Sequence, residues 1–237
     1  MTDLKDHQVL HIPIEDIYPV AEEYFLSTAR FDLNNEKHMR MWSRALEIYE
    51  ELRNKADLKA VYRYLVPERK EGKVFYFQGV PICCNAFEML SLENVKGAYF
   101  YLLTAGKVYT DSEQLVDQLY GDVWGTSLVD ALRTKVGEHI SSAESSKEDA
   151  GVLSEPFGPG YYGMPLEQTA ELFQIIDASL VDVYLSSGGM MVPQKSVTGL
   201  YLSVKDSTQL PPLSCESCIG GTSGCAFCNR SGVREDV

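Results

Sequence analysis

The order of apolar and polar positions along the chain predicts a mixture of helices and strands. Apolar residues recur at spacings of three and four through Glu36–Lys55, which predicts an amphipathic helix. A longer helix is predicted from the capping-box pattern at Thr110–Glu113 to about His139, and another over Leu166–Asp177. The predicted apolar stripe of the longer helix consists of Leu115, Val116, Leu119, Tyr120 and Val123.

Segments rich in β-forming residues predict several strands between these helices. Pro13 and Pro19 argue against a long regular element near the N-terminus. The polar, serine-rich stretch Ser141–Asp149 is typical of a loop. Helices and strands lack regular βαβ spacing, so the pattern favours the α+β class over a doubly wound parallel sheet. The predicted strands are Val9–Ile14, Lys73–Gln78, Gly97–Leu103, Val181–Leu185 and Val197–Val204.

Composition narrows the classes of protein that this chain can belong to. Its 237 residues suffice for one large domain or two small ones. The net charge of −13 would repel a polyphosphate, so we expect no nucleic-acid partner. No apolar run is long enough to cross a membrane, and the charged start lacks a signal-peptide core. We therefore expect a cytoplasmic protein without a membrane partner, whose thiols stay reduced.

The C-terminal stretch SCESCIGGTSGCAFCNR is typical of a metal site. It holds Cys215, Cys218, Cys225 and Cys228 as two Cys-x-x-Cys pairs, and two such pairs can complete a tetrahedral set of thiolates. Zinc ribbons usually place about 15–20 residues between the pairs, so the short spacing favours an iron–sulfur cluster, 4Fe–4S rather than 2Fe–2S. Zinc is the main alternative, and a disulfide or a disordered tail is the other. We expect two parts, a domain at 1–206 and a metal-binding tail at 207–237.

Two further cysteines, Cys83 and Cys84, lie in an apolar stretch and are interpreted as small core residues rather than ligands. Lys195 is interpreted as a solvated surface lysine, and Trp124 as a core residue.

Three segments in a fixed order resemble a known family. They are GDVWGTSLVDAL at Gly121–Leu132, GPGYYGMPLEQ at Gly158–Gln168 and GGMMVPQKSVTGLYLS at Gly188–Ser203. A helix and a short strand separate the last two. This arrangement resembles the activation domain of cobalamin-dependent methionine synthase, over roughly Leu90–Ser203. The residues that match the family pattern are Pro159, Gly160, Tyr161, Met191, Pro193, Ser196, Val197 and Gly199.

The resemblance implies a fold, a partner and a set of site residues. The fold would be α+β, with a curved, mostly antiparallel sheet and flanking helices. The domain would dock onto a corrinoid-binding protein or a cobalamin-dependent methyltransferase in its cob(II)alamin state, acting in trans. Tyr161 would be the catalytic residue on a turn that faces the corrinoid ring. The implied cofactor-binding residues are Gly160, Tyr161, Tyr162, Ser196 and Gly199.

Two departures from the family argue against binding of S-adenosylmethionine. The family arginine that contacts this cofactor corresponds to Pro156, and a family Tyr-Tyr pair corresponds to Gln209 and Leu210. Proline cannot replace a guanidinium that holds a carboxylate. The leading hypothesis is therefore an accessory protein that passes an electron from the iron–sulfur cluster, supplied by an upstream donor, to the corrinoid. The alternatives are S-adenosylmethionine-dependent reductive methylation and a zinc-clamped docking module without a redox role.

Overall fold

A five-stranded antiparallel sheet forms the centre of the protein. The structure, a computed structural model, describes residues 6–210. The strand order is β1-β2-β6-β10-β7, so the two longest strands, β6 and β10, lie side by side. Their pairing runs from Ser196 opposite Thr104 to Val204 opposite Val95. The strands are β1 (His7–His11), β2 (Lys59–Leu65), β6 (Val95–Thr104), β10 (Ser196–Val204) and β7 (Val152–Leu153).

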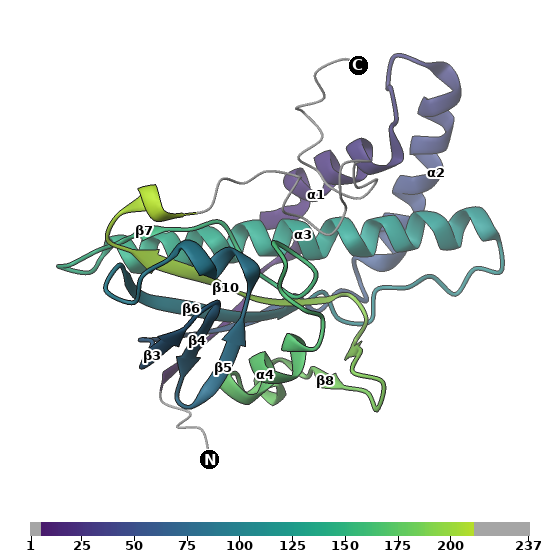
Figure 1. Ribbon diagram of the computed structural model, residues 1–237. Coiled ribbons are helices and arrows are strands. Elements are labelled where there is room, and N and C mark those ends of the chain that lie inside the picture. The colour runs from purple at the N-terminus through teal and green to yellow at the C-terminus, as the bar shows by residue number, and fades with distance from the viewer. Residues whose placement is uncertain (1–5, 211–237) are drawn as a thin grey trace.

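Both faces of this sheet are covered, which explains why β6 is apolar almost throughout. Alternate residues of β6, such as Tyr99 and Tyr101, point into a core shared with three helices. The residues between them, such as Phe100 and Leu102, point into a second core on the opposite face. Figure 1 shows the resulting three layers, with the sheet between the long helix α3 and the smaller elements near α4.

The helical layer consists of α1 (Ile14–Ala29), α2 (Glu36–Leu52) and α3 (Leu115–Ser145). Trp124 lies fully buried among them, and its Nε1 donates a hydrogen bond of 2.8 Å to the carbonyl oxygen of Ala45. The ring of Phe25 lies 4.3 Å from the Trp124 ring, between centroids. These contacts tie α3 to both shorter helices, and the interpretation of Trp124 as a core residue is confirmed.

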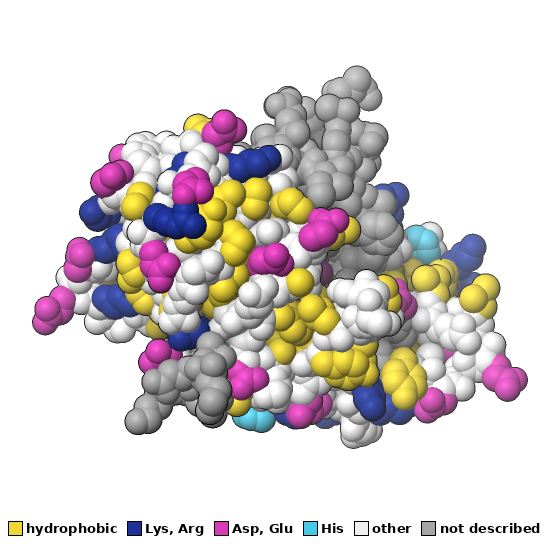
Figure 2. Space-filling model, turned by 60° about the horizontal axis from the view of Figure 1, so that its bottom comes forward, with side chains coloured by type: hydrophobic (Ala, Val, Ile, Leu, Met, Phe, Trp, Pro, Cys, Tyr) yellow, Lys and Arg dark blue, Asp and Glu magenta, His cyan; other side chains and the backbone are white. Residues whose placement is uncertain are grey.

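The opposite layer combines a small second sheet with short helices. Figure 2 shows the face that carries these elements, where apolar side chains gather over the centre among scattered charged ones. Exposed apolar residues in the segments around α4 and the β8–β9 hairpin include Leu166, Tyr184 and Met190. The elements are β3 (Arg69–Glu71), β4 (Val74–Phe77), β5 (Val80–Cys83), η2 (Asn85–Met89), α4 (Gln168–Ile175), η3 (Ala178–Val181), β8 (Tyr184–Leu185), β9 (Met191–Val192) and η4 (Ser207–Gln209).

The predicted α+β class, with a mostly antiparallel sheet and flanking helices, is confirmed. A short strand forms near the N-terminus as predicted, but the prediction that no long regular element follows it is wrong. The strand is His7–His11, but α1 begins at Ile14 and contains Pro19. Proline removes one helical hydrogen bond, and burial of Ile17 and Phe25 in the helical core offsets this loss.

The predicted bounds of α3 were also wrong. Gln114 is its N-cap residue, and no side chain caps the helix, so the capping box does not form. Leu115 and Leu119 are 79% and 58% exposed, and the buried stripe begins at Tyr120. The helix continues through the predicted loop to Ser145, because Glu144 is buried against the sheet by hydrogen bonds.

Three smaller predictions need correction. The helix predicted to reach Lys55 ends at Leu52, and α4 is shorter than predicted at both ends. The predicted strand Val181–Leu185 is instead the end of η3 followed by β8.

Within the described residues, no helix is both long enough and apolar enough to cross a membrane.

Candidate functional site

The turn at Gly158–Met164 is built by its own backbone. The amide N–H of Gly160 donates to the carbonyl of Met164 at 2.9 Å, and that of Met164 donates to the carbonyl of Tyr161 at 2.9 Å. Gly160 and Gly163 have φ angles of +87° and +73°, which glycine adopts without steric cost. Tyr162 has a φ of +52°, which is unusual for a bulky residue and is found mainly where the surroundings enforce it.

The turn is fastened to the central sheet at Gly199. Phe157 and Leu200 exchange two backbone hydrogen bonds of 2.8 Å, which bring the segment onto β10. A Cβ added at Gly199 would lie 2.3 Å from the carbonyl oxygen of Phe157 and 2.8 Å from the Tyr101 hydroxyl. A side chain at this position would therefore push the turn away, so Gly199 allows the turn to approach the sheet closely.

The two tyrosines of the turn occupy different surroundings. The Tyr162 ring packs edge-on against Phe157 in the second core, with centroids 5.5 Å apart, and its carbonyl accepts a hydrogen bond from the Cys84 thiol. Tyr161 is 49% exposed. Tyr161 is thus accessible to a ligand or partner, whereas Tyr162 holds the turn in place. The proposed roles of both residues remain predictions.

The helix α3 contributes a charged pair, Asp130 and Arg133, that sequence reasoning missed. Arg133 Nη2 lies 3.3 Å from Asp130 Oδ1, and the Arg133 side chain is 29% exposed. Burial raises the pKa of Asp130, while the charges of Arg133 and Lys195 act in the opposite direction. Burial also lowers the pKa of Arg133, but this is outweighed by Tyr101, Asp130, Tyr161 and Tyr201, and the net shift is upward.

Two buried tyrosines connect Arg133 to the strands beneath the turn. The rings of Tyr101 on β6 and Tyr201 on β10 lie 5.4 Å apart. The Tyr201 hydroxyl lies 2.9 Å from the position that a Cβ of Gly137 would occupy, one helical turn beyond Arg133. Burial raises the pKa of Tyr201 to about 12, so its hydroxyl stays protonated. We call Tyr101, Asp130, Arg133 and Tyr201 the arginine–tyrosine cluster.

A sequence signal for this cluster existed. Asp130 and Arg133 interrupt the run of apolar residues in SLVDALRTKV, three positions apart on one face of a helix. Their neighbours Val129, Ala131 and Leu132 are buried. Charged residues at such positions are uncommon unless they are paired or have a function.

Ser196 is the one predicted cofactor-binding residue that lies away from the turn. Its hydroxyl is 2.8 Å from Thr104 Oγ1 and donates to the carbonyl of Pro193 at 2.7 Å. These bonds connect the start of β10 to the end of β6. They suit a structural role, and the predicted role in cofactor binding remains a prediction.

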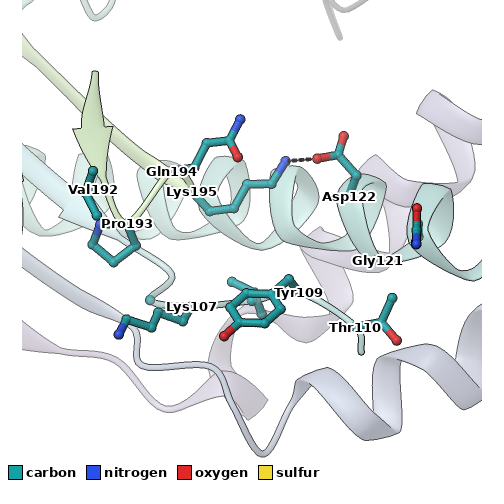
Figure 3. A pocket seen from close by; sticks show the side chains of 12 residues that line it. Lys107, Tyr109, Thr110, Gly121, Asp122, Val192, Pro193, Gln194 and Lys195 are labelled. Atoms are coloured by element: carbon teal, nitrogen blue, oxygen red, sulfur yellow. Dashed lines mark hydrogen bonds and ion pairs between the residues drawn. The ribbon is translucent and has the colours of Figure 1, made fainter. Parts of the chain in front are cut away.

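A groove of about 450 Å³ lies next to Ser196, between α3 and the loops that precede α3 and β10 (Figure 3). Lys195 stretches along it, and its Nζ donates to Asp122 Oδ1 at 2.7 Å and to Thr126 Oγ1 at 2.9 Å. The interpretation of Lys195 as a solvated lysine is therefore wrong. Its stem packs against Gly125, where a Cβ would come within 2.9 Å of it.

Cys215, Cys218, Cys225 and Cys228 lie outside the described residues, so their role as metal ligands remains a prediction. Among the described residues, no group of three or more His, Cys, Asp or Glu side chains could hold a metal ion. The interpretation of Cys84 as a core residue is confirmed, because it is fully buried and burial raises the pKa of its thiol to about 12.

Pro156, Gln209 and Leu210 occupy the positions at which the sequence departs from the resembled family. Pro156 precedes the turn and carries no donor. Gln209 Oε1 accepts hydrogen bonds from the backbone N–H and the hydroxyl of Ser91, and Leu210 packs against the second core.

Comparison with solved structures identifies a known fold. A crystal structure of the MetH reactivation domain bound to AdoHcy matches with a TM-score of 0.66, over 85% of this chain and 79% of that one. The two sequences are 13% identical, so the likeness establishes the fold alone. A scan against protein-family models and a search of curated proteins found no match.

Proposed function

We propose that this protein docks onto a corrinoid-binding protein and takes part in the reductive reactivation of its cob(II)alamin. The observation that carries the proposal is the fold, which matches the MetH reactivation domain over most of both chains. The segment whose sequence resembles that family forms an exposed turn on this fold. A shared fold does not by itself imply a shared function, so the proposal also rests on the surface that the turn presents.

That surface is suited to contact with a large, partly apolar partner. Tyr161 and Leu166 are both exposed, and a Cβ on Gly160 would lie 3.4 Å from Leu166 Cδ2, so the two residues belong to one patch. Tyrosine contributes strongly to interfaces because its ring is large and rigid and carries a polar end. In the proposed complex, Tyr161 lies against the corrinoid of the partner.

The electron would come from the C-terminal cysteines. Four thiolates suit an iron–sulfur cluster, which changes its oxidation state by one electron. Cob(II)alamin needs one electron to become cob(I)alamin, and an upstream donor would then reduce the cluster again. If the cysteines instead bind zinc, which has no redox chemistry, the protein would serve as a docking module and the electron would reach the corrinoid from another protein.

The first test identifies the metal and then the reaction. Protein purified without oxygen is analysed for iron, zinc and acid-labile sulfide. It is then mixed with a reductant and a corrinoid protein in its cob(II)alamin state, and visible spectra follow the cobalt. We expect iron with matching sulfide, and faster formation of cob(I)alamin than with reductant alone. Zinc without sulfide would refute the electron-transfer role.

A matched pair of variants tests the docking surface. Tyr161→Ala should slow the reduction, whereas Tyr184→Ala should not, although Tyr184 is also exposed and lies on the β8–β9 hairpin. Equal effects of the two substitutions would show that the turn is not the contact.

A second candidate function is S-adenosylmethionine-dependent reductive methylation of the corrinoid. It is favoured by the AdoHcy bound in the structural neighbour. Methyl transfer would leave S-adenosylhomocysteine as the product, so its formation in the same assay separates this function from electron delivery alone.

A further inference from the structure

The loop that follows α3 carries a lysine whose ammonium group lies in an aromatic cage. Lys147 Nζ lies 3.3 Å from the centroid of the Tyr64 ring and 4.8 Å from that of the Tyr99 ring. Both distances fall within the range of about 6 Å over which a ring attracts a cation. The two rings are 4.8 Å apart between centroids and inclined at 55°, so they form two walls. The Glu144 carboxylate, 2.8 Å from Nζ, forms the third wall.

The walls of this cage are held by hydrogen bonds that do not involve the ammonium group. The Tyr99 hydroxyl donates to Glu144 at 2.7 Å, and both residues are 2% exposed. The Tyr64 hydroxyl donates to the carbonyl of Lys96 at 3.0 Å. A Cβ on Gly97 would come within 2.3 Å of the Tyr64 ring, so glycine leaves the space that this ring fills. The cage would therefore keep its shape if the lysine left it.

Lys147 is a replaceable occupant of the cage. Its ammonium group is buried, but it makes no hydrogen bond of regular geometry to any described residue, so its charge and its contact with the rings hold it in place. The side chain as a whole is 34% exposed and belongs to the loop between α3 and β7. Its stem thus leads from the cage to solvent, along the path that a cation from solution would take.

The chemistry of the cage favours a quaternary ammonium group as that cation. Aromatic faces attract such groups, which carry no N–H and so lose nothing in a site without a well-directed acceptor. The buried Glu144 carboxylate requires a positive charge beside it. A metal ion would find one carboxylate and two aromatic rings, which supply too few oxygen ligands.

We propose that Tyr64, Tyr99 and Glu144 form a binding site for a small ligand with a trimethylammonium group, and that Lys147 closes this site as a built-in competitor. Binding exchanges one cation for another, so Glu144 keeps a counter-charge throughout. The inference goes beyond the proposed function and does not depend on it, because the cage shares no residue with the turn at Gly158–Met164.

Choline tests the charge requirement, with 3,3-dimethyl-1-butanol as its uncharged counterpart of the same shape. Binding of each is measured by isothermal titration calorimetry on the full chain and on Lys147→Ala. The lysine must leave before choline enters, so the affinity of the unmodified protein is reduced by the fraction of molecules in which the cage is open. If Lys147 fills the cage in about nine-tenths of the molecules or more, Lys147→Ala should bind choline at least about tenfold more tightly.

Lys135→Ala is the control for removal of the lysine. Lys135 also pairs with a glutamate three positions away, Glu138, but this pair is exposed. Its loss should leave choline binding unchanged, and the alcohol should bind to none of the variants.

A second pair of substitutions tests the aromatic wall in the Lys147→Ala background. Tyr64→Leu should weaken choline binding about tenfold or more, whereas Tyr64→Phe, which keeps the ring, should retain most of it. Tyr76→Leu is the matched control, because Arg69 lies 3.3 Å from the centroid of that ring on the β3–β4 hairpin, outside the cage. It should leave the affinity for choline unchanged.

Urea unfolding of each variant separates loss of binding from loss of fold. Lys147→Ala should have a lower urea midpoint because Glu144 loses its counter-charge, and choline should raise that midpoint while the alcohol should not. If Lys147→Ala unfolds, choline should restore its fold, and the absence of this rescue would count against the site. Folded Lys147→Ala that does not bind choline would overturn the proposal, since Lys147 would then serve only to neutralise Glu144. Equal binding of choline and the alcohol, or full affinity in Tyr64→Leu, would overturn it as well.

Discussion

The buried carboxylate of Glu144 should make the stability of the protein depend on pH. Its side chain is 2% exposed, near the end of α3. It accepts hydrogen bonds from the Tyr99 hydroxyl at 2.7 Å, the Ser203 hydroxyl at 2.6 Å and the Gly151 N–H at 2.6 Å. Lys147 Nζ lies 2.8 Å from the same carboxylate. These contacts join α3 to β6 and β10, and α3 also carries Arg133.

The free energy that the Glu144 carboxylate contributes to folding follows from the shift of its pKa. Burial tends to raise the pKa of Glu144, but Lys147, Ser203 and the other donors outweigh it and lower the pKa from 4.5 to about 2. This difference corresponds to about 3 kcal/mol. Because the folded-state pKa is the lower one, the stabilisation is complete above the unfolded-state value of 4.5. It is lost progressively as the pH falls towards 2.

The assay compares unfolding free energies at about pH 6 and about pH 3, from urea titrations followed by tryptophan fluorescence. Over this interval the Glu144 carboxylate should lose about 2 kcal/mol of its contribution. Glu144→Gln should therefore have a clearly lower unfolding free energy than the unmodified protein at pH 6. This gap between the two unfolding free energies should shrink by about 2 kcal/mol at pH 3. Glu138→Gln is the control, because that carboxylate is 60% exposed on the same helix and its gap should change little. A gap for Glu144→Gln that is the same at both pH values would refute the reasoning.

Three other predictions concern the turn and the cysteines. Gly199→Ala should lower the unfolding free energy by about 1–3 kcal/mol, since its Cβ would collide with the Phe157 carbonyl, and an unchanged urea midpoint would contradict this. Tyr161→Phe should change stability by less than about 0.5 kcal/mol, because the residue is half exposed, yet it should slow cob(II)alamin reduction if the hydroxyl contributes to docking. Normal reduction by Tyr161→Phe would limit the role of Tyr161 to its ring. Cys215→Ser should remove iron, sulfide and visible absorbance together, and full retention of all three would exclude this thiolate as a ligand.

Part of the sheet could be predicted because its signal is local. The strands β6 and β10 are rich in β-forming residues, and both were located within two residues of their ends. The strand β2, which pairs with β6, was not predicted. The turn at Gly158–Met164 was likewise evident from its glycines, which can adopt positive φ wherever the rest of the chain lies. Class, main strands and turn therefore follow from short stretches considered alone.

Other features depend on contacts between distant parts of the chain. The helix α1 forms in spite of Pro19 because Ile17 and Phe25 enter a core that α3 completes, and burial there outweighs one lost hydrogen bond. Gly137 and Tyr201 are 64 positions apart, and no periodicity relates them. They meet because α3 lies along β10, and the turn reaches the same strand at Gly199. The sequence by itself determined the fold class, the strands β6 and β10, and the glycine turn. Only the tertiary structure decided that α3 and the turn both pack on β10, because those contacts join residues that are far apart in the sequence.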